Sequence, residues 1–79
     1  MFVLKGKINT SNSPELEERL LKELPTEIDA GGLEYISSSG LRALLRLRKA
    51  VGEVTLKNVK PEIYEIFEVT GFTDILNIE

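Results

Sequence analysis

The sequence predicts an α/β fold in which a mainly parallel sheet of four strands is combined with three main helices. Two observations support this prediction. Runs typical of strands and runs typical of amphipathic helices alternate three times along the chain, and a short apolar run closes it. Consecutive strands are also separated by helices of about ten residues, which is the kind of connection that parallel pairing requires.

Size and composition limit what the chain can do. Its 79 residues, 42% of them hydrophobic, suit one small domain, so residues 1–79 are predicted to form a single domain. The absence of cysteine and histidine excludes a thiol nucleophile, a Cys/His zinc site, an imidazole base and a disulfide framework. We therefore expect no catalytic residues, no metal site and no cofactor.

Charge and hydropathy restrict the partners. The net charge of −3 argues against a nucleic-acid binder, which normally needs a basic face. No apolar run approaches the roughly 20 residues of a membrane span. The first residues, MFVLKGK, also lack the pattern of a signal peptide. We expect a cytoplasmic protein that does not insert into membranes.

The first strand and the first helix are predicted within residues 2–25. Residues 2–8 alternate in the manner of a strand. Ser13 followed by Pro14 is typical of an N-cap with proline at the first helical position, so a helix begins there and Pro25 ends it. The leucines expected on its apolar face are Leu16, Leu20, Leu21 and Leu24.

The middle of the chain is predicted to contain a strand, a turn and a helix. Residues 26–30 form a short buried strand, and Gly31 with Gly32 forms a turn after it. A helix then runs from about Ser39 to Val51, with Gly52 as its C-cap. Its inward residues are Leu41, Leu44, Leu45, Leu47 and Val51, and its opposite face carries Arg42, Arg46 and Lys49.

The last third repeats the alternation. Residues 54–57 are predicted as the third strand, and Pro61 opens a helix that stops at Thr70 and Gly71. Residues 74–78 supply a last short strand. The inward residues of the helix are Ile63, Ile66 and Phe67.

Three consecutive serines, Ser37, Ser38 and Ser39, stand where the middle helix has unpaired backbone N–H groups. Their hydroxyl oxygens can accept hydrogen bonds from those groups, so helix capping is their first interpretation. The positive end of the helix dipole lies at the same place and tolerates an added phosphate or a bound anion. A surface serine there is therefore a candidate switch. The basic side chains that follow are either a solvated helix face or a docking surface beside that phosphate.

The segment DAGGLEYISSSGLRALL, residues 29–45, resembles the signature of the STAS domain, the fold of bacterial anti-sigma factor antagonists. In that family an Asp-Leu-Ser strand end leads into a D-S-S/T-G-L helix start. The resemblance extends in the right order to LKGKINT at residues 4–10, LKNV at 56–59 and TGF at 70–72. It implies a non-catalytic interaction module that binds an anti-sigma factor or serine kinase and switches partners on phosphorylation.

The resemblance also assigns roles to single residues. The serine that a partner kinase phosphorylates falls on Ser38, the following Ser/Thr on Ser39, and the glycine on Gly40. Two acids of the family pattern are replaced, one by Ser37 and one by Asn9. These replacements favour an alternative, a STAS-type subunit that binds the ATPase of a bacterial ABC system for lipid transport. The expected partner-binding residues are Asn9, Ser37, Ser38, Ser39, Gly40 and Arg42.

Two further expectations concern the edge of the sheet and catalysis. Too few residues precede Phe2 for the extra N-terminal strand typical of the family. Residues 2–8 should then form an edge guarded by Lys5 and Lys7, with weak self-association as the result. An enzyme with a serine nucleophile would need Lys, Asp or Glu as its base, but no S-x-x-K spacing occurs. We expect no enzyme.

Overall fold

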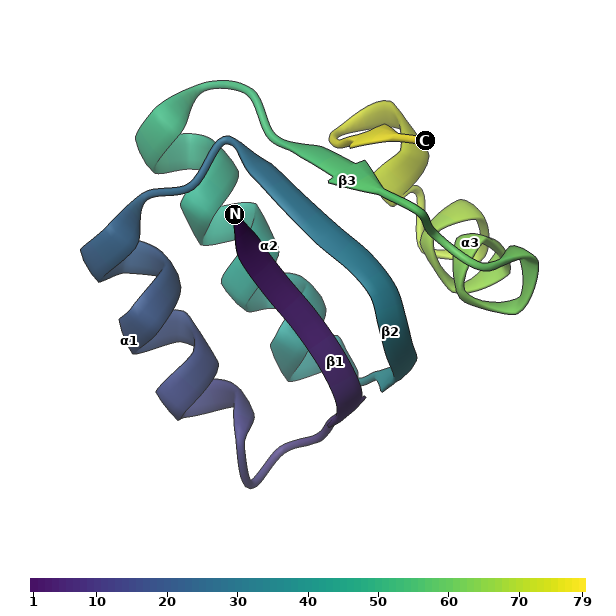
Figure 1. Ribbon diagram of the computed structural model, residues 1–79, viewed down its shortest axis with the longest axis horizontal. Helices are drawn as coiled ribbons and strands as arrows, with labels where there is room; N and C mark the ends of the chain where they lie inside the picture. The colour runs from purple at the N-terminus through teal and green to yellow at the C-terminus, as the bar shows by residue number, and fades with distance from the viewer.

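A computed structural model describes residues 1–79 as one parallel sheet with helices packed behind it (Figure 1). The strands stand in the order β1-β2-β3-β4, and every neighbouring pair is parallel. The strands are β1 (Phe2–Ile8), β2 (Glu27–Ile36), β3 (Thr55–Lys57) and β4 (Asn77–Ile78). The helices are α1 (Ser13–Glu23), α2 (Ser38–Val51), α3 (Pro61–Val69) and the short 3-10 helix η1 (Phe72–Asp74). The predicted α/β fold is confirmed.

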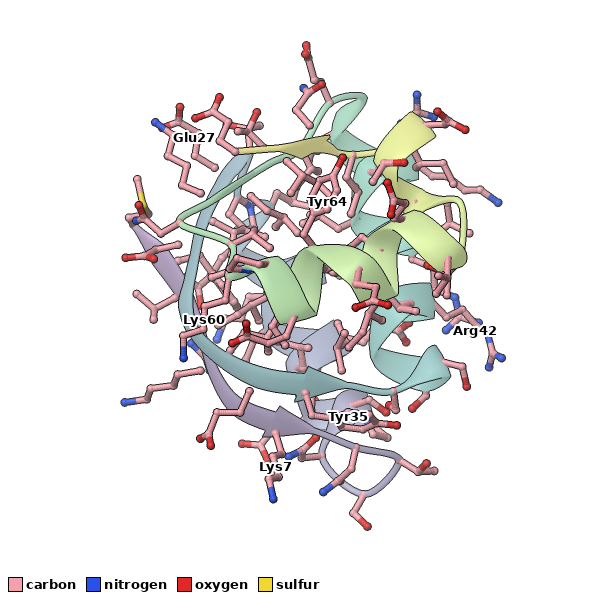
Figure 2. All side chains as sticks on the ribbon, turned by 90° about the vertical axis from the view of Figure 1, so that its right-hand side faces the viewer. Lys7, Glu27, Tyr35, Arg42, Lys60 and Tyr64 are labelled. Carbon is pink, nitrogen blue, oxygen red and sulfur yellow. The ribbon has the colours of Figure 1, made fainter.

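The helices cover one face of the sheet and leave the other open. Each strand lies next to its predecessor in the same direction, so right-handed crossovers place every connecting helix on the same side. In β1 the side chains of Phe2, Leu4 and Ile8 are buried, whereas Val3 and the two lysines are exposed. In Figure 2 the long strands run along the left and lower side of the molecule and the helices lie to their right. One cluster of 18 buried residues fills the space between the layers.

The predicted turn at Gly31 and Gly32 is wrong, because β2 continues through both glycines to Ile36. Val3 pairs with Asp29 and Lys5 with Gly32, so β2 uses one residue more than β1 over this stretch, as in a β-bulge. A Cβ atom at Gly32 would lie only 3.1 Å from the Cβ of Lys5. The glycines therefore permit an irregular and close strand pairing, and do not end the strand.

Helix α1 also differs from its prediction. Its N-cap is Asn12, and Ser13 is already helical. The helix ends at Glu23, and Leu24 closes it in the left-handed region, where its N–H bonds to the carbonyl of Leu20 at 2.8 Å. Of the four predicted inward leucines, Leu16 and Leu20 are buried, but Leu21 and Leu24 are exposed.

In α2 and α3 most predicted inward residues are buried. Helix α2 begins at Ser38, one residue earlier than predicted, and buries Leu41, Leu44 and Leu47 in the core. Leu45 is only half-buried and is not among the core residues or the side chains packed against them. In α3, Ile63 and Phe67 are buried and Ile66 packs against the core. No helix has the length and apolar character needed to cross a membrane.

Candidate functional site

The start of α2 lies at the carboxyl edge of the sheet, beside the loop that joins β1 to α1. The carboxyl ends of parallel strands meet at one edge, so this loop and the serines become neighbours although they are distant in sequence. The contact between them is direct, because the N–H of Ser37 donates to the carbonyl of Ile8 at 2.8 Å.

Ser37 is the N-cap of α2. Its backbone is extended, with φ −82° and ψ 170°, and its Oγ accepts a hydrogen bond from the N–H of Gly40 at 3.3 Å. This is the geometry of a capping serine, which satisfies one of the free N–H groups of the first turn. The capping prediction is thus confirmed for Ser37.

Ser39 connects the starts of two helices. The hydroxyl of Ser13 donates to Ser39 Oγ at 2.8 Å, and Ser39 Oγ lies 2.9 Å from Ser37 Oγ. Ser13 is only 4% exposed, and it is the one buried polar residue of the chain. The sequence reasoning treated Ser13 as a helix cap and missed this contact, because nothing in the local pattern relates it to a serine 26 positions later.

Ser38 differs from both of its neighbours because its side chain is exposed. The hydroxyl-mediated hydrogen bonds at this helix start are made by Ser37 and Ser39. Ser38 is the first helical residue, next to the free N–H groups, and the first turn of α2 contains no acidic residue. Arg42 follows one turn later on the same side of the helix and is also exposed.

Gly40 allows the serines to sit this close to the sheet. An added Cβ atom would lie 2.7 Å from Ile8 Cγ2 and 2.8 Å from Ile36 Cγ1, inside the distance that real Cβ contacts tolerate. Any side chain at Gly40 would push the first turn of α2 away from the ends of β1 and β2. Gly40 is buried, and its role is to let the first turn of α2 pack closely on the ends of β1 and β2.

Asn9 organises the neighbouring loop. Its Oδ1 accepts hydrogen bonds from the N–H groups of Ser11 and Asn12 at 2.9 and 3.0 Å. Its own N–H donates to Asn12 Oδ1 at 2.8 Å. This is an Asx-type turn, in which the oxygen of an aspartate could accept the same bonds. Asn9 directly follows Ile8, whose carbonyl holds Ser37.

A polar groove lies between the starts of α1 and α2, lined by Ser13, Pro14, Glu17, Ser39, Arg42 and Arg46. Arg46 Nη1 lies 2.6 Å from Glu17 Oε1 in an ion pair across this groove. Arg42 makes no ion pair within the chain. The structure thus brings four predicted residues together at one helix start, with Arg42 one turn away and Asn9 in the adjoining loop. They are Ser37, Ser38, Ser39 and Gly40.

A carboxylate at the other end of the sheet is separate from this site. Asp29 pairs with Val3 and projects from β2 on the open face. A hydrogen bond from the N–H of Gly31 at 2.9 Å, and a second from Asn58 Nδ2 at 3.3 Å, hold the pKa of Asp29 below its ordinary value. No group of three or more acidic, cysteine or histidine side chains is placed to hold a metal ion.

Comparison with known proteins identifies relatives over nearly the whole chain. The family model of the STAS domain matches residues 1–79. A Bordetella bronchiseptica protein named "Putative anti-sigma factor antagonist BtrV" is 37% identical over 84 residues, covering 95% of this chain and 72% of that protein. The anti-sigma-B factor antagonist of Listeria monocytogenes is 30% identical over 83 residues, covering 94% of this chain and 73% of that protein.

Proposed function

Because the chain belongs to the STAS domain family, we propose that it is an antagonist that binds an anti-sigma factor through the start of α2. Phosphorylation of Ser38 by a serine kinase, which is the anti-sigma factor itself or its partner, ends that binding. The chain performs no catalysis in this scheme, because it only presents a hydroxyl group and a binding surface.

The position of Ser38 is the observation that carries this proposal. Its hydroxyl is exposed, whereas the hydroxyls on either side are held by hydrogen bonds. A phosphate there adds about −1.5 to −2 charges and three acceptor oxygens. The helix dipole and the free N–H groups of the first turn favour that charge, and Arg42 lies one turn away. Phosphorylation should therefore leave the fold intact.

Release of the partner follows from desolvation. A partner that packs closely over Ser38 and Arg42 would have to bury the phosphate. Its charge of about −1.5 to −2 exceeds what the single cation Arg42 can neutralise, and burying the remaining charge costs several kcal/mol. Steric and electrostatic exclusion is then sufficient, without a conformational change in the domain.

A second candidate is a STAS-type subunit that binds the ATPase of a lipid-transport ABC system and needs no phosphorylation. The observation that favours it is that Ser37 and Asn9 are neutral where the antagonist pattern has acids. Both side chains are also occupied locally, as a helix cap and in an Asx turn.

The test uses the purified chain, the purified anti-sigma factor kinases of the same genome, and ATP. Mass spectrometry should find phosphate on Ser38, and Ser38→Ala should remain unmodified and bind constitutively. Ser38→Asp should bind much more weakly, with its melting temperature within a few degrees of wild type. Phosphate on Ser37 or Ser39, or on no serine, would disprove the assignment. Binding to an ABC ATPase in place of any anti-sigma factor would establish the second candidate.

A further inference from the structure

One face of α2 combines the candidate switch with unpaired cations and a half-buried leucine. Ser38, Arg42, Leu45 and Lys49 follow one another at spacings of four, three and four residues. At about 100° per residue, they lie within an arc of about 60° on the helix. Ser38, Arg42 and Lys49 are exposed, so this arc points away from the sheet. We name these four residues the α2 outer face.

The charge of α2 is unlike that of the rest of the chain. The net charge of the chain is −3, yet α2 contains four cationic residues and no acidic one. They are Arg42, Arg46, Arg48 and Lys49. Arg46 is paired with Glu17, but Arg42 and Lys49 make no ion pair within the chain. The two cations of the outer face are therefore available to a partner.

Leu45 lies between those two cations. It is half-buried and, unlike Leu44 beside it, does not belong to the core. An apolar side chain outside the core, with one unpaired cation before it and one after it along the helix, has the composition of an interface anchor within a charged rim.

We infer that the α2 outer face is the docking surface for the protein partner, and that the partner presents an apolar pocket for Leu45 with carboxylates around it. This inference rests on the proposed function and adds the chemistry of the partner. The two cations of the α2 outer face, Arg42 and Lys49, are about 10 Å apart along the helix at 1.5 Å per residue, so the carboxylates of the partner should have a similar spacing.

The neighbouring helix α1 argues against a nucleic acid or an anionic membrane as the occupant. It packs beside α2 and carries exposed or half-exposed acids, which repel phosphate groups. These acids are Glu15, Glu17 and Glu18. A binder of phosphate backbones needs a continuous basic surface. Here four of the ten cationic residues lie on α2, and the other six are spread over β1, α1, β3 and the start of α3.

This surface also gives Ser38 phosphorylation a second effect. A phosphate on Ser38 would lie one helical turn from Arg42 and could pair with it. The partner would then lose a cation as well as meet a new negative charge. Both changes occur at the same end of the α2 outer face.

The experiment measures affinity for the purified anti-sigma factor that binds the wild-type chain. Arg42→Glu with Lys49→Glu should weaken binding by about tenfold or more and flatten its dependence on salt. Leu45→Ser should weaken binding while the salt dependence remains. The matched control is Lys22→Glu with Lys60→Glu, which makes the same charge change off the α2 outer face and should stay within about twofold. Lys60 and Arg42 point away from each other in Figure 2.

The outcomes separate this inference from the proposed function. If the wild-type chain binds but both charge-reversed variants weaken binding equally, only net charge matters and the inference is wrong. Unchanged binding by Leu45→Ser would exclude the anchor. If the chain binds a 20-nucleotide single-stranded DNA more tightly than the anti-sigma factor, the inference of a protein partner at the α2 outer face is wrong. If the wild-type chain binds no anti-sigma factor, the proposed function itself fails, and this inference fails with it. Urea unfolding of each variant shows that the fold is retained.

Discussion

Two adjacent leucines of α2 should respond very differently to truncation. Leu44 is 0% exposed and belongs to the core cluster, whereas Leu45 is half-buried and lies outside it. Leu44→Ala removes buried carbon atoms and leaves a cavity between the helix layer and the sheet. Leu45→Ala removes atoms that are partly hydrated already and opens no enclosed space.

The expected losses follow from this difference. Leu44→Ala should lower the free energy of unfolding by about 2–5 kcal/mol, which combines the lost burial with the cavity. At roughly 0.05–0.15 kcal/mol per residue, a chain of 79 residues has a total stability of about 4–12 kcal/mol. The Leu44 loss is therefore a large part of that total. Leu45→Ala should cost about 1 kcal/mol or less.

Urea unfolding followed by circular dichroism measures both losses, provided the slope with urea stays constant among the variants. A Leu44 loss below about 1 kcal/mol would show that α2 does not pack on the sheet as described. A Leu45 loss as large as that of Leu44 would place Leu45 in the core. Its role in the α2 outer face would then have to be abandoned.

Three other predictions concern the helix cap, the open face and the sheet edge. Ser37→Ala should lower the free energy of unfolding by about 0.5–2 kcal/mol, measured by thermal or urea unfolding, because the helix loses its cap. Ser38→Ala should leave that free energy within about 0.5 kcal/mol of wild type, and equal losses in the two variants would contradict the assigned roles. The pKa of Asp29 is held low, so its stabilising effect is present above about pH 4 and is lost as the pH falls through the lowered pKa. An NMR acid titration should show the pKa of Asp29 below its ordinary value, and Asn58→Ala should raise that pKa part of the way back. An ordinary pKa in the wild type would refute the effect of these hydrogen bonds. Because β1 has a strand neighbour on one side only, we expect weak self-association in sedimentation experiments at high protein concentration. Val3→Lys should suppress this self-association, and a strictly monomeric wild type would exclude pairing through the β1 edge.

The order of the elements could be predicted from the sequence because the hydrophobic period changes clearly between strands and helices. The error at Gly31 and Gly32 has a physical cause. Glycine occurs both in turns and in irregular strands, and only the pairing with a partner strand distinguishes the two. The pairing of Lys5 with Gly32 is a tertiary fact that no local pattern contains.

The candidate site was predictable in position but not in the division of roles. The serines mark a helix start, and the pattern alone assigns capping to all three. The contact of Ser39 with Ser13 depends on α1 and α2 starting at the same edge of the sheet. The place of Leu45 depends on how much of α2 is covered by its neighbours, which a helical period does not fix.

This division of roles restricts where a phosphate can be accepted. On Ser39 it would replace a part-buried hydroxyl that bonds to Ser13 and Ser37, so both contacts would be lost and a charge would be placed against α1. On Ser37 it would displace the cap of Gly40. Only Ser38 can carry the charge while its two neighbours keep their bonds to the fold. A kinase that modified any of the three serines without selectivity would thus lower the stability of part of the population, whereas one confined to Ser38 would change binding alone. Thermal unfolding of each singly phosphorylated form should therefore rank Ser38 above Ser37 and Ser39 in melting temperature.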